Sequence, residues 1–313
     1  MSLIVTGNTL QENFYSGLIA RFLKENDTLP HIHVEGGAIS GKYNIPTAYN
    51  TVSSIQDYAA TPSSPLGGQQ FKDRKITLGK WMLYQEFLPI DLKQYWAPYT
   101  PAGGEFLFHS LPTDVQSTML GLVFNETGGH MSKISWKGDT ALSTDVKYFD
   151  GFEKLAKTDP DTVKISGVTL TSGNILATID AALTTARGSS DAFRIASYKP
   201  EMKVFMSYKT FELYGAALKA LTNKSISYEQ ATPKMFAGIT VVPQAYVSDD
   251  AFIFAAGNNS VSSDLWMAVN SVQDADTLKV EKLQNNSEKF FAKMVLSAGV
   301  AFVKPEEVAI RYK

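Results

Sequence analysis

The chain has 313 residues, of which 44% are hydrophobic and 19% are charged, so it can bury the core of one large or two moderate domains. It has no cysteine, which excludes disulfides, thiol nucleophiles and cysteine-ligated zinc. Its formal net charge of -2 gives no electrostatic reason to coat nucleic acid. Because no apolar run approaches the roughly 18 residues of a membrane span, we expect no membrane partner.

The first 35 residues combine a short helical pattern with a polar break, which predicts an N-terminal arm. Two runs with the pattern of strands follow, near Tyr43–Val52 and Phe71–Leu83. The stretch between them is rich in Gly, Pro and Ser and has too little apolar content to make a core. We therefore expect a long protruding hairpin whose tip is not buried within its own subunit.

The next predicted element is a helix at Pro112–Thr127. It begins with proline, carries apolar residues on one face and ends at Gly128 and Gly129, which is the usual punctuation of a helix. A β-like stretch is expected at Ile134–Asp139. A turn-rich passage is expected from there to Gly167.

Two helices and a series of strands are predicted in the remaining chain. Apolar residues at helical spacing predict one helix that starts after Thr171 and Ser172 and stops at Gly188. The same spacing, at Phe211, Tyr214, Leu218 and Leu221, predicts a second helix. Strands are expected at Lys203–Met206, Ile239–Val242, Phe252–Ala255 and Leu265–Val269.

Near the C-terminus, apolar side chains occupy every second position of one long run. They are Phe290, Ala292, Met294, Leu296, Ala298, Val300 and Phe302. This alternation predicts a single strand with a buried face, which at ~3.4 Å per residue would reach about 40 to 45 Å. Strands are usually about five or six residues long. A strand of this length suits a flat subunit that tiles a surface, so assembly is the first property to test.

This order of elements resembles the major capsid proteins of tailed bacteriophages, which have the Hong Kong 97-like fold. The strings that fit include Ile-Ser-Trp-Lys-Gly-Asp from Ile134, Gly-Val-Thr-Leu-Thr-Ser-Gly from Gly167, and Lys-Val-Phe-Met from Lys203. Two more begin at Phe236 and Phe290. The resemblance spans nearly the whole chain and rests on pattern and order, because this family has no invariant motif.

The resemblance implies an α+β fold with an N-arm, an extended β-hairpin loop, a spine helix, a peripheral domain and an axial domain. The arm would be residues 1–42 and the extended loop 43–82. The peripheral domain would be 83–164, with the spine helix at about 112–128. The axial domain would be 165–285, and 286–313 would be the long C-terminal strand that completes the core.

The resemblance also implies a function. The chain would be a structural protein, not an enzyme, without a cofactor, and would self-assemble into pentamers and hexamers of an icosahedral shell around double-stranded DNA. Its partners would be other copies, DNA without sequence-specific contacts, a separate scaffold protein, a portal and decoration proteins. Its location would be the virion capsid, assembled in the host cytoplasm. An encapsulin-type protein nanocompartment is an alternative with the same fold.

A metal-dependent enzyme is an alternative from another class. His31, His33 and Glu35 alternate as ligands would on one face of a strand, and such pairs of histidines bind zinc or iron. The other histidines, His109 and His130, have no recognisable third-ligand spacing. The favoured interpretation is therefore that these are polar residues on a strand of the arm.

Charge suggests how subunits could contact each other. The predicted return strand of the hairpin is basic at Lys72, Arg74 and Lys75. Residues 235–278 contain no Lys or Arg but several aspartates, and the contact candidates among them are Asp249, Asp250 and Asp264. We hypothesise that the basic strand rests on an acidic neighbour, with an ordinary solvated surface as the alternative. If the charges are incidental, the hairpin would dock through the side chains of Tyr49, Tyr58 and Phe71 or through its backbone edge.

Overall fold

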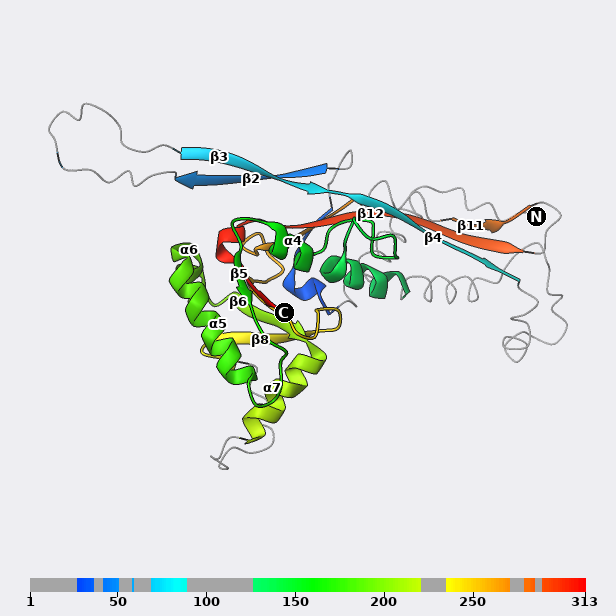
Figure 1. Ribbon diagram of the computed structural model, residues 1–313. Helices are drawn as coiled ribbons and strands as arrows, with labels where there is room; N and C mark the ends of the chain where they lie inside the picture. The colour runs from blue at the N-terminus through cyan, green and yellow to red at the C-terminus, as the bar shows by residue number, and fades with distance from the viewer. Residues whose placement is uncertain are drawn as a thin grey trace.

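The computed structural model describes residues 27–36, 42–50, 58, 69–88, 126–220, 235–270, 279–284 and 289–313. These residues form a five-stranded sheet, a six-stranded sheet and a two-stranded ribbon, with helices packed on the sheets. The ribbon and the long strands of the five-stranded sheet run one after the other along the length of the molecule (Figure 1). The chain therefore has an elongated α+β fold, as its sequence predicted.

Strand β12 (Phe290–Phe302) is the centre of the five-stranded sheet. Along one edge it pairs antiparallel with β4 (Gly79–Phe87), and along the other with β10 (Leu265–Val269) and β11 (Lys279–Lys282). The fifth strand, β1 (His33–Glu35), runs parallel to β10. Every apolar position of the alternating set in β12 is buried, which confirms the predicted long strand.

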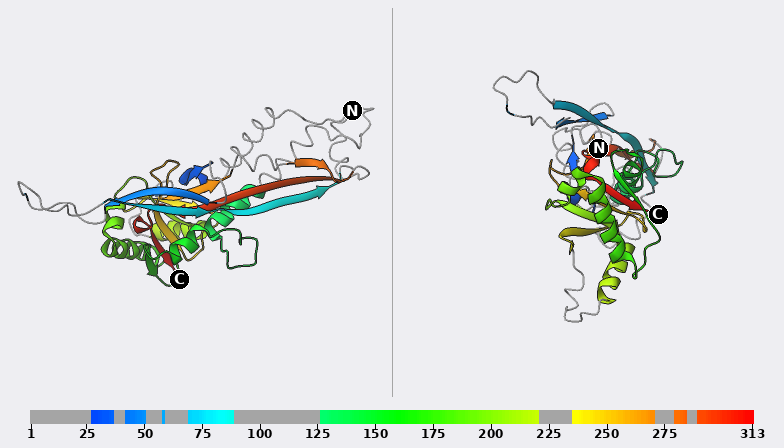
Figure 2. Two further views of the ribbon diagram at one scale, coloured as in Figure 1. Left: turned by 90° about the horizontal axis from the view of Figure 1, so that it is seen from above. Right: turned by 60° about the vertical axis from the view of Figure 1, so that its left-hand side comes forward.

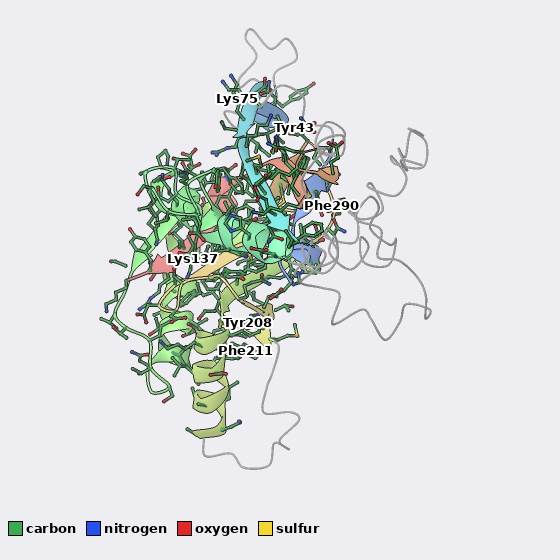
Figure 3. The ribbon with its side chains drawn as sticks, turned by 90° about the vertical axis from the view of Figure 1, so that its right-hand side faces the viewer. Tyr43, Lys75, Lys137, Tyr208, Phe211 and Phe290 are labelled. Carbon is green, nitrogen blue, oxygen red and sulfur yellow. The ribbon has the colours of Figure 1, made fainter. Side chains whose placement is uncertain are left out.

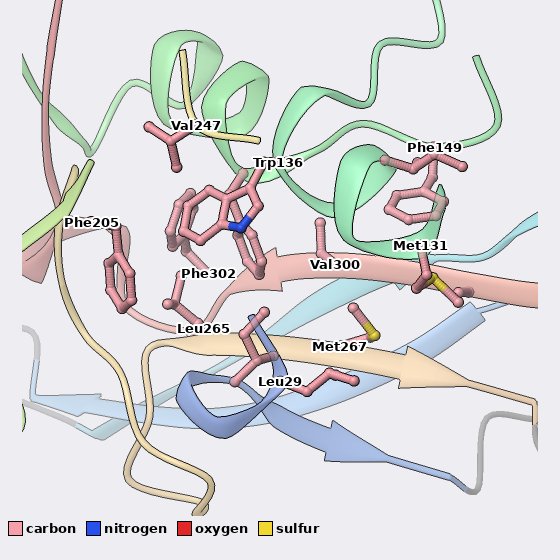
Figure 4. Packing of buried hydrophobic residues seen from close by; sticks show 14 of the residues in the cluster. Leu29, Met131, Trp136, Phe149, Phe205, Val247, Leu265, Met267, Val300 and Phe302 are labelled. Atoms are coloured by element: carbon pink, nitrogen blue, oxygen red, sulfur yellow. The ribbon is translucent and has the colours of Figure 1, made fainter. Parts of the chain in front are cut away.

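The burial of β12 changes along its length. In the first half only alternate residues are buried, whereas every residue from Ala298 to Phe302 is buried. One face of this second half, with Val300, packs against Trp136 in the main core (Figure 4). The opposite face, with Ala301, belongs to a smaller core beneath the ribbon. The second half is thus covered on both sides.

The six-stranded sheet is mixed and has the order β5-β13-β9-β6-β8-β7. Its strands are β5 (Val163–Ser166), β6 (Met202–Ser207), β7 (Met235–Phe236), β8 (Ile239–Gln244), β9 (Phe252–Ala256) and β13 (Ala309–Tyr312). Three helices share a core with one face of it: α5 (Ile175–Ser189), α6 (Asp191–Ala196) and α7 (Tyr208–Ala220). The other face joins the main core, so that in β6 Val204 and Met206 face the helices while Phe205 faces the five-stranded sheet.

The chain passes between the two sheets twice after β9. It first runs from β9 to β10, and then from β12 through the 3-10 turn η3 (Pro305–Glu307) to β13. As a result, β10 of the five-stranded sheet lies within the predicted axial range 165–285, and the last strand lies inside the six-stranded sheet. Every helix within the described ranges is too short or too polar to cross a bilayer.

The ribbon consists of β2 (Lys42–Asn50) and β3 (Gln69–Thr77), paired antiparallel along their whole length. The predicted hairpin is therefore confirmed. Its return strand differs from the prediction because it is divided at Leu78: β3 pairs with β2, and beyond Leu78 the chain continues as β4, which pairs with β12. One extended segment thus links the ribbon to the centre of the five-stranded sheet (Figure 2).

Most of the predicted elements in the second half of the chain are confirmed. The two helices are α5 and α7, and the strands are β6, β8, β9 and β10. The turn-rich passage was wrong in part, because it contains the short helix α4 (Phe152–Thr158) and β5. These two elements are too short for their periodicity to be visible in the sequence.

The predicted β-like stretch at Ile134–Asp139 was wrong. Residues 126–137 are helical, and the helix runs through the Gly128-Gly129 pair that was expected to end one. Thr127, Met131 and Ser135 are buried at four-residue spacing, and the Ser135 hydroxyl donates to the Met131 carbonyl at 2.7 Å. Residues 1–26 of the predicted arm and 112–125 of the predicted spine helix lie outside the described residues.

Candidate assembly surfaces

The root of the ribbon is packed on the five-stranded sheet. Tyr43, Ile45 and Ile76 point inward from the ribbon and share the small core with Trp266 and Ala301. The Tyr43 ring stacks on the Trp266 ring, with centroids 6.5 Å apart. The alternation of inward and outward side chains in both strands therefore fixes which face of the ribbon meets the body.

Two glycines allow backbone segments to approach closely at this root. A Cβ atom on Gly299 of β12 would overlap the carbonyl oxygen of Thr77, the last residue of β3. A Cβ atom on Gly79, the first residue of β4, would overlap the carbonyl oxygen of Tyr148. Only glycine lacks a Cβ atom, so the direction in which the ribbon leaves the body depends on both positions.

Arg74 is paired within its own subunit. Its Nη1 lies 2.7 Å from Oδ2 of Asp159, which caps the C-terminus of α4, and its Nη2 lies 3.8 Å from Oδ2 of Asp161. Only 28% of the Arg74 side chain and 16% of the Asp159 side chain are exposed. We expected Arg74 to meet a neighbouring subunit, but its charge is already matched inside the chain. The pair is a third attachment of the ribbon to the body.

Of the other contact candidates on the ribbon, the structure describes the side chains of Lys75 and Tyr58. Lys75 is exposed on the ribbon, above the body of the subunit (Figure 3). Tyr58, which lies in the segment of the chain that connects β2 to β3, is 96% exposed. The side chains of Tyr49, Phe71 and Lys72 lie outside the described residues, so their contacts stay predictions.

The acidic candidates lie at opposite ends of one strand. Asp249 and Asp250 precede β9, whereas Asp264 follows it. The Oδ2 atom of Asp249 is 3.1 Å from Nζ of Lys209, and this hydrogen bond lowers the pKa of the carboxyl group. The Oδ1 atom of Asp250 accepts a hydrogen bond from the backbone N–H of Leu170 at 2.9 Å, so that residue fastens a loop.

Asp264 does not lie on a surface. It is only 2% exposed, and its Oδ2 accepts a hydrogen bond from the backbone N–H of Ala256 at 3.2 Å. Burial, followed by repulsion from the Glu307 carboxylate, raises the pKa of Asp264 to about 7. This position contrasts with the expectation that Asp264 would face a basic neighbour, because its carboxyl group is enclosed within its own subunit.

His31 and His33 have separate surroundings. His31 ends η1 (Leu29–His31) instead of lying on a strand, which corrects the prediction, and its Nδ1 accepts a hydrogen bond from Nζ of Lys203 at 3.1 Å. Burial, and then the charge of Lys203, lowers the pKa of His31 to about 4. His33 lies on β1, with its ring 4.3 Å from the ring of Trp266. The described part of the chain contains no group of three His, Cys, Asp or Glu residues that could hold a metal ion.

Comparisons with known proteins agree with this architecture at the level of fold. No family model and no curated protein match the chain. A chain of the satellite phage P4 procapsid is 11% identical and superposes with a TM-score of 0.66 over 95% of this chain and 90% of that one. The capsid of the Myoviridae phage XM1 is 14% identical, with a TM-score of 0.58 over 90% and 89%. The chain has a phage capsid fold.

The phage capsid fold is not confined to tailed phages among the matching structures. A virus-like particle from Pyrococcus furiosus is 10% identical, with a TM-score of 0.51 over 95% of this chain and 97% of that one. These matches cover 90% or more of the chain. The resemblance inferred from the order of elements is therefore confirmed for the fold.

Within this capsid fold, an exposed surface on β4 was missed from the sequence. Its outward residues Lys80, Met82, Tyr84 and Glu86 are all exposed, with Met82 at 53% and Tyr84 at 43%. Across the ladder, the Tyr84 ring stacks on the Phe291 ring of β12 at 5.8 Å. The alternation in β4 is a visible signal, but without knowing that one face is covered by the main core we could not say which face is free.

Proposed function

We propose that this protein is the structural shell subunit of a phage capsid, with the Hong Kong 97-like variant of the fold. Copies of the chain would form pentamers and hexamers of an icosahedral shell that encloses double-stranded DNA. A separate scaffold protein, a portal and decoration proteins would be further partners, and the virion capsid, assembled in the host cytoplasm, would be the location. We propose the arm, extended loop, spine helix, peripheral domain and axial domain with the boundaries expected from the sequence, except that β10 belongs to the five-stranded sheet and β13 to the six-stranded sheet.

The proposal is carried by the reach of the ribbon past its own root. Among the described side chains, inward packing involves Tyr43, Ile45 and Ile76, while the ladder continues to Asn50 and Gln69. Tyr58, farther along the chain, is 96% exposed. A two-stranded hairpin is only marginally stable alone in water, so the distal part requires a surface on another subunit.

The way the ribbon is held supports docking onto a neighbour. The small core, the two glycine contacts and the Arg74–Asp159 pair fix its direction before any neighbour is met. Such preorganisation reduces the entropy lost on association. A net charge of -2 on the chain also leaves little long-range repulsion between copies.

Electron microscopy and light scattering of the purified full-length protein test this function. We expect uniform rings or closed shells, formed alone or together with a candidate scaffold protein. A folded monomer that persists at high concentration in both conditions would overturn the proposal. Replacing the exposed Tyr58 side chain by serine (Tyr58→Ser) should weaken assembly. Tyr198→Ser makes the same substitution at another exposed tyrosine, near α6, and serves as the control.

The encapsulin-type nanocompartment is the second candidate, favoured by the similarity to the virus-like particle from Pyrococcus furiosus. Both candidates predict a closed shell, and they differ in its contents. Nuclease digestion followed by mass spectrometry of purified shells separates them. Nuclease-resistant DNA would support the phage capsid, whereas a second protein enclosed in the shell would support the nanocompartment.

A further inference from the structure

Asp264 lies where the chain passes between the two sheets, and it bonds to both. Its backbone N–H donates to the carbonyl of Ala256 at 2.8 Å, and its Oδ2 accepts from the N–H of Ala256 at 3.2 Å. Its own carbonyl accepts from the N–H of Val303 at 2.9 Å. Ala256 ends β9 of the six-stranded sheet, and Val303 follows β12 of the five-stranded sheet. One buried residue therefore ties the two sheets together.

Three charged side chains from other segments face the Asp264 carboxyl group. Glu307 belongs to η3, Lys304 precedes it, and Lys199 follows α6. The Glu307 carboxylate is 2.6 Å from Nζ of Lys199 and 3.3 Å from Nζ of Lys304, and its side chain is 14% exposed. Both lysines thus pair with Glu307, and within the described ranges no salt bridge reaches Asp264.

We propose that Asp264 is a proton-controlled fastener between the two sheets, firm when its carboxyl group is neutral and loosened when that group ionises. The neutral form suits a side chain that is 2% exposed. Ionisation would place a second negative charge near Glu307 in a buried position that has no cation of its own, which is costly. Ionisation strengthens the bond from the Ala256 N–H to Oδ2, but the larger cost of burying the charge is relieved only when this segment opens toward water, which breaks the backbone bonds to Ala256 and Val303.

The direction of the pH effect follows from the change on folding. The pKa of Asp264 rises from 3.8 to about 7, so between these values the folded state keeps a proton that the unfolded state has lost. Stability from the neutral carboxyl group is fully present below pH 3.8 and is lost as the pH rises through about 7. Loosening is therefore expected on the alkaline side, opposite to the behaviour of an aspartate in a salt bridge.

The test compares Asp264→Asn with the wild type as full-length proteins in the same state of assembly. Asparagine keeps an oxygen acceptor for the N–H of Ala256 but cannot ionise. Between pH 5.5 and 8.5, we expect the melting temperature of the wild type to fall by several degrees relative to the variant. Amide hydrogen exchange at Ala256 and Val303, corrected for intrinsic rates, should lose protection at high pH in the wild type only. Glu306→Gln, on the adjacent carboxyl group of η3, is the control and should follow the wild type.

Parallel pH profiles of the wild type and Asp264→Asn would overturn the proposal. A second variant keeps the test decisive if Asp264→Asn does not fold. Glu307→Gln removes the neighbouring negative charge and leaves the hydrogen bonds of Asp264 in place. The pKa of Asp264 should then fall, so the loss of stability should occur at lower pH and be smaller than in the wild type. A melting profile of Glu307→Gln with the same dependence on pH as the wild type would also contradict the proposal.

Discussion

Arg74 and Lys75 are neighbours in sequence but lie on opposite faces of β3. Arg74 is paired with Asp159 at 2.7 Å, whereas Lys75 is exposed. Arg74→Ala is therefore expected to lower the free energy of unfolding by about 1 kcal/mol, the usual size for a partly buried hydrogen-bonded ion pair. Lys75→Ala should change it by less than about 0.5 kcal/mol. Urea unfolding of both variants measures the difference.

An exchange of charges controls this prediction. Arg74→Asp combined with Asp159→Arg should recover part of the stability that Arg74→Asp alone removes, because the pair lies within one subunit. Equal losses from the Arg74 and Lys75 substitutions, or no recovery on exchange, would show that the pair does not attach the ribbon.

His31 should make the fold sensitive to acid. Its pKa in the folded state is about 4, below the ordinary 6.5, so stability from the neutral ring is complete above pH 6.5 and is lost as the pH falls through 4. After allowance for partial solvent exposure, the effect is on the order of 2 kcal/mol. Urea unfolding at pH 7 and pH 4.5 should show a smaller loss in His31→Gln than in the wild type.

The slopes due to His31 and Asp264 oppose each other between about pH 4 and 6.5, because one group resists gaining a proton and the other resists losing one. A flat profile of the wild type would therefore not contradict either assignment. Only the difference between each variant and the wild type isolates one group. If His31→Gln loses as much stability in acid as the wild type, the ring of His31 is not the group responsible.

At the scale of elements, strong periodicity decided what could be predicted. β12, α5 and α7 have long alternating or helical patterns and were found. The helix over residues 126–137 was missed because Ile134 and Trp136 imitate a strand. α6 has only six residues, and its one local signal was Ser190, whose Oγ accepts from the N–H of Phe193 at 3.2 Å.

In the candidate assembly surfaces, too, features with a local sequence pattern could be predicted and tertiary contacts could not. The hairpin followed from turn formers and strand patterns, which are local. The partner of Arg74 lies 85 residues away, and the burial of Asp264 depends on where the chain changes sheets. Such tertiary contacts leave no local pattern, so charge alone could not show that Arg74 is paired with Asp159 or that Asp264 is buried.

The glycines at the ribbon root give an element-scale prediction. Gly299→Ala should lower the free energy of unfolding by about 1–3 kcal/mol, because a methyl group would overlap the carbonyl oxygen of Thr77. Gly188→Ala is the matched control: it lies in α5 with open space around it and should raise stability by up to about 1 kcal/mol. Thermal unfolding compares them. Equal effects at the two positions would mean that the close approach is not required.

At the scale of the molecule, removing residues 54–68 should separate folding from assembly. The deletion leaves β2 and β3 complete and joins them through residues 51–53, a loop length that hairpins use. We expect the melting temperature of the isolated chain to stay nearly unchanged, because none of the core residues in the described part of the chain comes from 54–68. We expect shell formation to weaken. Cooperative unfolding of the deletion variant, seen by circular dichroism, would show instead that the hairpin belongs to the core.

The pairing of β12 with β4 has a consequence for the time course of folding. The two strands lie roughly 200 residues apart in sequence, and contacts of such separation form slowly. Gly299 and Ala301, which hold the ribbon root, belong to β12. Until that late strand is inserted, the ribbon has no fixed direction in which to meet another copy. The order of folding would thus delay docking, because the ribbon of a chain that is still incompletely folded could not yet point toward another copy.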